Sequence, residues 1–233
     1  MNITIIKATN RKNSSTYNAA KYFISKLSDA GAVFEFTLPE DMPHICRGCY
    51  VCLYGHEEKC GGYEYLKPIN DAFSRSQLII FCCPVWCFHA PGQIKSFLDH
   101  YGYRWLVHRP NFEMFEKQAV IITTAGGGGL KSAAKDIKDS MDYWGIARTH
   151  IVTQSVWGYF WNDMPDRFKK SFEKNLDKTA KKVEKYAENL KPSFKVKSLY
   201  NMFLKLHLND KLWEIDNAYW QENRGGEKAH GNK

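Results

Sequence analysis

Five short runs rich in β-branched and apolar residues, each followed by a polar loop or a helical pattern, constrain the fold most. We expect strands at 3–8, 32–38, 77–85, 118–125 and 146–160. Helical patterns lie between them: one ends at Gly31, one includes 69–76, one begins near Pro91, and one covers Leu130 to Trp144. Strands alternating with helices predict an α/β fold, a doubly wound parallel sheet covered on both faces.

The loop after the first strand, "TNRKNSST" from Thr9 to Thr16, joins a strand to the start of a helix. In such sheets ligands bind beyond the carboxyl ends of the strands. The free N–H groups of the first helical turn attract a phosphate, and four hydroxyl groups here add donors. Simple capping of the helix by Ser14 or Ser15 is the alternative. The loop matches neither a Walker loop nor a G-x-G-x-x-G loop, which favours the phosphate of a mononucleotide.

The loops after the third and fourth strands are expected at the same edge of the sheet. "PVWCFHAPGQ" places Trp86, Cys87, Phe88 and His89 where they can line a flat apolar ring. The glycines at 126–129 allow backbone N–H groups to approach a ligand closely. Alternatively, the two aromatic residues belong to the core and His89 is an ordinary polar residue.

Four of the seven cysteines lie between Cys46 and Cys60, with the spacing C-x2-C-x2-C-x7-C. This segment follows the second strand, so we expect it near the binding edge. No signal peptide precedes the first strand, so we expect a cytoplasmic protein, where clustered cysteines bind metals or act as redox thiols more often than they form disulfides. A metal site, free or redox-active thiols, and a disulfide framework remain alternatives. Cys82 and Cys83 fall in a buried strand and are expected in the core, whereas Cys87 is expected to face the ring site.

The net charge of +8 could attract nucleic acid or an anionic membrane. However, the sequence contains no nucleic-acid reader motif and no apolar run near the roughly 20 residues that span a bilayer. Much of the charge lies between Arg167 and Lys197, where helical spacing of apolar residues predicts a surface helix with a basic face. We therefore expect no nucleic-acid partner and no membrane insertion.

The pattern changes near Pro192. We expect a principal domain at 1–190 and a partly helical C-terminal extension at 191–233, which packs on the domain or on a second subunit. The last ten residues contain too few apolar side chains to order themselves, so a disordered tail is expected at 224–233.

Four segments, "KATNRKNSST", "CRGCYVCLYGHEEKC", "SQLIIFCCPVWCFHAPGQIKSFLDH" and "VIITTAGGGG", occur in this order along the chain. Together they resemble the flavodoxin-like NAD(P)H-dependent FMN reductases, including the iron-sulfur flavoproteins. The resemblance covers about residues 1–190 and is most specific in the third segment. It implies a five-stranded parallel sheet in the order 2-1-3-4-5, non-covalently bound FMN, and a homodimer or a tetramer.

The resemblance also assigns site residues by position. Those expected to hold the FMN phosphate are Thr9, Arg11, Asn13, Ser14, Ser15 and Thr16. Those expected beside the ribityl chain and the ring are Pro84, Val85, Trp86, Cys87 and Phe88. Those expected at the polar edge of the ring are Thr124, Ala125, Gly126, Gly127 and Gly128. The first loop departs from the family pattern, because Ala8-Thr9-Asn10-Arg11 replaces the usual Gly-Ser-Pro-Arg.

The resemblance implies an enzyme that passes electrons from NAD(P)H through FMN to a quinone, a flavin or a similar acceptor. The flavin carries out the chemistry, so no catalytic side chain is expected. The alternative is an electron carrier, either a flavodoxin or an iron-sulfur flavoprotein in which Cys46, Cys49, Cys52 and Cys60 ligate a [4Fe-4S] cluster. Dedicated flavodoxins tend to be acidic, so the basic charge favours the reductase.

Overall fold

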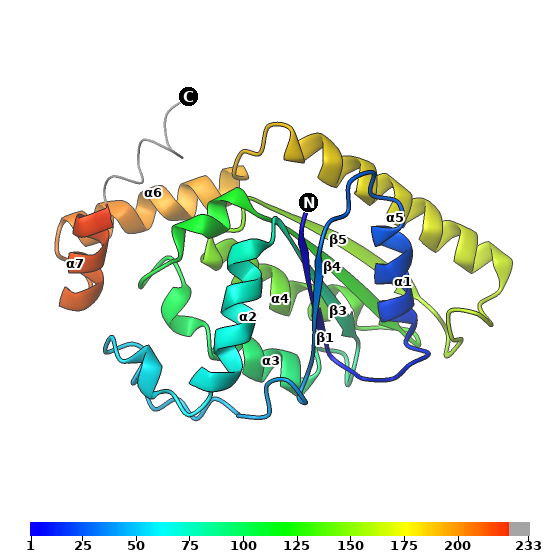
Figure 1. Ribbon diagram of the computed structural model, residues 1–233, viewed down its shortest axis with the longest axis horizontal. Coiled ribbons are helices and arrows are strands. Elements are labelled where there is room, and N and C mark those ends of the chain that lie inside the picture. Colours follow the sequence, from blue (N-terminus) through cyan, green and yellow to red (C-terminus); the bar gives the residue numbers. More distant parts are fainter. Residues whose placement is uncertain (224–233) are drawn as a thin grey trace.

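The computed structural model describes residues 1–223, so the tail predicted to be disordered at 224–233 lies outside the described residues. Five strands form one sheet: β1 (Ile3–Lys7), β2 (Val33–Thr37), β3 (Leu78–Pro84), β4 (Gln118–Ala125) and β5 (Arg148–Ser155). All neighbouring strands are parallel, and their order is β2-β1-β3-β4-β5 (Figure 1). The predicted flavodoxin-like sheet is therefore confirmed.

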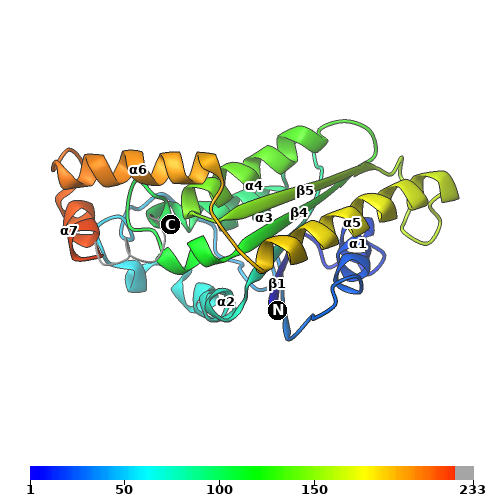
Figure 2. The ribbon, with the colours of Figure 1, turned by 90° about the horizontal axis from the view of Figure 1, so that it is seen from above.

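Helices cover both faces of this sheet (Figure 2). One face packs against α1 (Ser15–Ile24) and α5 (Asp166–Ala187). The other packs against α2 (Tyr63–Arg75), α3 (Gly92–Asp99) and α4 (Leu130–Trp144). Two more helices follow, α6 (Phe194–Leu208) and α7 (Glu214–Glu222). Three short 3-10 turns lie earlier in the chain: η1 (Glu57–Lys59), η2 (Gly102–Arg104) and η3 (Phe112–Glu116). No helix among residues 1–223 is both long enough and apolar enough to cross a membrane.

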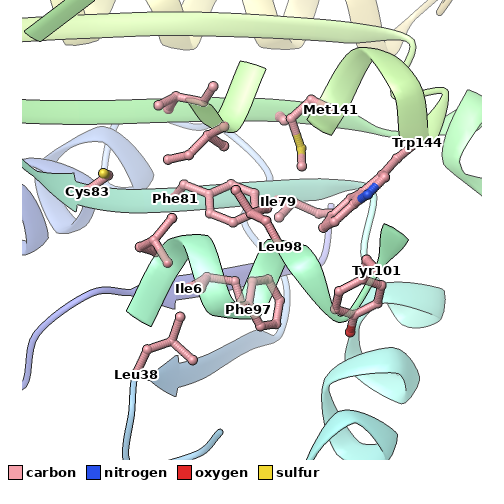
Figure 3. Close-up of a cluster of buried hydrophobic side chains, with 14 of the residues drawn as sticks. Ile6, Leu38, Ile79, Phe81, Cys83, Phe97, Leu98, Tyr101, Met141 and Trp144 are labelled. Carbon is pink, nitrogen blue, oxygen red and sulfur yellow. The ribbon is translucent and has the colours of Figure 1, made fainter. Parts of the chain in front are cut away.

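The core on the α2–α3–α4 face combines strand residues with large aromatic side chains (Figure 3). Phe81 in β3 lies 6.4 Å from Phe97 in α3, and Tyr101 lies 4.9 Å from Trp144 in α4, measured between ring centroids. Cys83 is buried in this core and Cys82 on the opposite face, as the sequence predicted. Burial raises the pKa of the Cys83 thiol to about 12, so both cysteines act as small apolar residues.

Several element boundaries differ from the prediction. α1 ends at Ile24 rather than at Gly31. α2 begins at Tyr63 and contains Pro68, because Leu66, Ile69 and Phe73 present a continuous apolar face to the core. Pro91 is the residue before α3 rather than its first helical residue. β5 is shorter than expected, since its pairing with β4 ends at Ser155.

The C-terminal extension packs on the principal domain through a third apolar cluster. Trp220 in α7 is 1% exposed, and its indole Nε1–H donates to the carbonyl of His108 at 2.6 Å. His207 in α6 stacks on the same indole ring at 5.0 Å. Both views place α6 and α7 beyond one end of the sheet, at the amino ends of its strands (Figures 1 and 2).

His150 in β5 makes stability dependent on pH. Burial, followed by the nearby Lys182 and Arg148, lowers its pKa from 6.5 to about 4. The unfolded chain therefore binds the proton more readily, and this contribution to stability is full above about pH 6.5 and is lost as pH falls towards 4. We expect a loss of about 3 kcal/mol across that interval.

Urea unfolding at pH 7 and pH 4 tests this. His150→Gln keeps a donor for the Gln118 side chain, which accepts from His150 Nε2 at 3.0 Å, and should flatten the pH dependence. The exposed His56→Gln is the control and should retain it. An unchanged slope in the His150 variant would refute the assignment.

Candidate functional site

A cavity of about 230 Å³ lies at the carboxyl ends of β1, β3, β4 and β5. It is lined by Thr9, Arg11, Ser14, Ser15, Thr16, Pro84, Val85, Trp86, Thr124, Ala125, Gly126, Val156, Gly158, Tyr159 and Phe160. Hydroxyl groups and one guanidinium line the side formed by the first loop, whereas mainly apolar side chains line the rest. This division suits a ligand with an anionic end and an apolar end.

The first loop is fixed to the sheet by hydroxyl groups. Ser14 caps α1 by accepting from the N–H of Tyr17 at 3.4 Å. The helix capping that we gave as the alternative is therefore present. Thr16 Oγ1 lies 3.0 Å from Thr124 Oγ1 at the end of β4, and Ser15 Oγ donates to the carbonyl of Tyr159 at 3.1 Å. These contacts hold the start of α1 at the cavity wall, where its free N–H groups and positive dipole end favour an anion.

The loop after β3 makes a tight turn beside the cavity. The backbones of Trp86 and His89 exchange two hydrogen bonds of 3.0 Å, and Cys87 and Phe88 between them have φ angles of 48° and 66°. Side-chain-bearing residues rarely adopt this left-handed conformation. Gly129 packs closely against this turn, because an added Cβ would lie 2.6 Å from Phe88 Cα and 2.7 Å from Val85 Cγ1.

The structure therefore gathers most of the predicted residues from all three loops at one cavity. The predicted residues that do not line it are Asn13, Cys87, Phe88, Gly127 and Gly128. Gly128 instead lies against the Phe88 ring, since an added Cβ would be 2.7 Å from Phe88 Cε1. Whether any of these residues binds FMN stays a prediction.

The sequence analysis missed the part of the wall that follows β5. Val156, Gly158, Tyr159 and Phe160 line the cavity, and the Arg11 guanidinium lies 5.8 Å from the Phe160 ring. Their signal was the aromatic run "SVWGYF", which we assigned to a strand. In a parallel sheet residues just after the fifth strand reach the same edge as the other loops, so that position indicated a role.

Residues 1–161 match the model of a family described as NADPH-dependent FMN reductase. The chain belongs to this family. It is therefore an NAD(P)H-dependent FMN oxidoreductase with the fold that the resemblance implied. No protein with a curated description matches the chain.

Solved structures of similar fold include flavin enzymes of low sequence identity. An FMN-dependent NADH-azoreductase from Bacillus anthracis, in complex with FMN, is 14% identical with a TM-score of 0.60, covering 78% of this chain and 99% of the other. The NAD(P)H:quinone oxidoreductase from Methanothermobacter marburgensis is 16% identical with a TM-score of 0.58, covering 79% and 97%. At these identities the likeness supports the fold alone.

In this member of the FMN reductase family the cysteine segment lies apart from that cavity, although we predicted it near the binding edge. The chain after β2 runs along α3 and α2 towards α7 (Figure 1). The backbone N–H of Cys46 donates to Ser96 Oγ at 3.4 Å, and Tyr54 stacks on Trp213 at 5.7 Å between ring centroids. Long-range contacts with α3 and the start of α7 thus hold the segment away from the sheet edge.

Within residues 1–223 no three histidine, cysteine, aspartate or glutamate side chains are arranged to hold a metal ion. The positions of Cys46, Cys49, Cys52 and Cys60 therefore give the [4Fe-4S] alternative no support. None of the four forms a disulfide.

Proposed function

We propose that this FMN reductase binds FMN in the cavity at the sheet edge and passes electrons from NAD(P)H to a quinone, a free flavin or a similar small acceptor. The observation that carries the proposal is the cavity itself. One side presents the start of α1 with the buried hydroxyls of Ser14, Ser15 and Thr16, and the other presents Pro84, Val85 and Ala125. A phosphate suits the first side and a flat ring suits the second.

The residues act by binding and orienting rather than by proton transfer. The N–H groups of the first turn of α1, with Thr9 and Arg11, would hold the phosphate, and backbone groups near Gly126 would meet the polar edge of the ring. FMN, when bound, supplies the hydride acceptor and donor. The cavity is smaller than the roughly 300–1,000 Å³ of typical ligand sites, so part of the cofactor would extend over its rim.

The rim carries exposed aromatic side chains. Trp86, Phe88, Trp157, Tyr159 and Phe160 are between 40% and 68% exposed. Such a patch beside a cofactor site suits coverage by a second copy of the chain, which supports the expected homodimer or tetramer. Light scattering of the purified protein tests this proposal, and a monomer with bound FMN would contradict it. The cytoplasmic location stays a prediction.

Steady-state oxidation of NADH and NADPH by the FMN-loaded protein tests the function. We expect turnover well above background with at least one of a quinone, free FMN or an azo dye, and no turnover with the quinone or the dye after FMN is removed. Ser14→Ala together with Thr16→Val should weaken FMN binding about tenfold or more, because each hydrogen bond to a charged group contributes roughly 1.5–3 kcal/mol. Ser25→Ala, a hydroxyl deletion at the other end of α1, is the matched control.

Background rates with every acceptor, despite bound FMN, would refute the reductase and leave the electron carrier. Iron and acid-labile sulfide assays after anaerobic purification test the iron-sulfur form of that carrier. Only the cysteine spacing favours an iron-sulfur cluster, so the proposed function does not include one.

A further inference from the structure

A second cavity, of about 400 Å³, lies at the cysteine segment. Its walls are His44 and residues 46–53, with Cys60, Gly61, Asp99, His100, Gly102 and Tyr103. It shares no lining residue with the FMN cavity. All four clustered cysteines line it, so a small molecule that enters meets several thiols.

Cys60 is the thiol with a base beside it. Its Sγ lies 3.6 Å from His100 Nδ1, and His100 Nε2 lies 3.1 Å from the carbonyl oxygen of His44. A carbonyl only accepts, so Nε2 carries the hydrogen and Nδ1 of the neutral ring presents a lone pair to the thiol. The contacts therefore form a chain in which the carbonyl of His44 orients the imidazole and the imidazole accepts from Cys60.

His100 is 3% exposed, so the imidazole that faces Cys60 is buried. A nucleophile held against a base that a third group orients is the arrangement by which thiols and hydroxyls are activated.

The other cysteines lack this contact. Cys46 and Cys52 are partly buried, and neither thiol has a hydrogen-bonded base among the described residues. Cys49 is exposed but has no hydrogen-bonded base among the contacts of residues 1–223. Exposure alone would thus make Cys49 the most reactive of the four, whereas the base contact favours Cys60.

The cavity also offers binding groups for a small organic molecule. Tyr50 and Tyr103 contribute aromatic surface, and Arg47 contributes a positive charge. The Nδ1 atom of His44 is buried and has no hydrogen-bond partner in the part of the chain that the structure describes. A buried polar atom without a partner is costly unless a ligand or water satisfies it, so it points to an occupant with a polar group.

We propose that Cys60 is a reactive thiol that undergoes exchange with a low-molecular-weight disulfide bearing carboxylates. Cys60 Sγ attacks one sulfur of the disulfide while its proton passes to His100 Nδ1. A new S–S bond to Cys60 forms, the original S–S bond breaks, and the leaving thiolate takes the proton from His100. The products are a mixed disulfide on Cys60 and one free small thiol, and no other oxidant or reductant is needed.

Substoichiometric labelling of the FMN-loaded protein with Ellman's reagent, an aromatic carboxylate disulfide, tests the proposal. Tryptic cleavage separates the thiols, because residues 60–75 contain only Cys60, 27–47 only Cys46, and 48–59 both Cys49 and Cys52. We expect the first label on 60–75, and oxidised glutathione should modify the same peptide. First labelling of 48–59 would overturn the proposal.

Two variants and a control sharpen the test. Cys60→Ser should abolish the fast release of the coloured thiolate, and Cys49→Ser should retain it. His100→Asn removes the base and should slow labelling of Cys60 roughly tenfold or more. FMN binding at the separate cavity reports whether that variant folds; if it does not fold, peptide mapping of the unsubstituted protein still decides. Stoichiometric iron or zinc that blocks the thiols would also overturn the proposal.

Discussion

Asp216→Asn is expected to lower the free energy of unfolding by about 3–5 kcal/mol, the usual cost of removing one partner from a buried ion pair. The Asp216 carboxylate is 1% exposed and pairs with Arg109, whose side chain is 7% exposed. It also lies 2.7 Å from His108 Nδ1. Without the carboxylate the Arg109 guanidinium stays buried with its main counter-charge gone, since Glu57 lies farther away at 3.7 Å.

The substitution Asp216→Asn should also destabilise the cysteine segment. Arg109 donates to the carbonyls of Cys52 and Leu53, so this one guanidinium joins α7 to the segment that lines the second cavity. We expect faster proteolysis both at 44–56 and between α6 and α7. Urea unfolding gives the stability change. Glu222→Gln, an exposed acid on the same helix, is the control and should change stability by about 0.5 kcal/mol or less. A stability change in Asp216→Asn as small as this would show that water reaches and solvates Arg109.

Local patterns in the sequence predicted the sheet because its central strands are mostly apolar. β3 and β4 are almost completely buried, and such runs are recognisable without knowledge of their partners. The same logic located the first, third and fourth loops at one edge. It did not include Tyr159 and Phe160, because an aromatic run just after a strand reads as part of that strand.

Two features of the sites had no local signal. The position of the cysteine segment depends on contacts far along the chain, such as His44 with His100 and Cys52 with Arg109. The sequence also could not show which of the four glycines at 126–129 are closely packed, since only the folded loop shows which of them contacts another segment. Gly126 and Gly127 face open space, whereas Gly128 and Gly129 lie against the Phe88 turn.

That difference leads to the second large effect, a loss of FMN binding in Gly129→Ala. Gly129 has a φ of 84°, which costs a residue with a Cβ roughly 1–2 kcal/mol. The new methyl group would also lie 2.6 Å from Phe88 Cα and 2.8 Å from the Phe88 carbonyl oxygen. These are backbone atoms of an already strained turn, so the loop that carries Val85 and Trp86 must move away from the cavity.

Overpacking of this kind costs about 1–3 kcal/mol, and we expect the Kd for FMN, measured by quenching of flavin fluorescence, to rise about tenfold to a hundredfold. Gly92→Ala is the matched control, because nothing lies within 4 Å of its added Cβ and Gly92 begins α3 with ordinary helical geometry. It should bind FMN like the unsubstituted protein and be slightly more stable, since alanine favours a helix over glycine. Equal FMN affinity in both variants would mean that the turn at Phe88 does not position the cofactor. If FMN affinity falls only in Gly129→Ala, the contact between the start of α4 and the turn at Phe88 positions the loop that binds the cofactor.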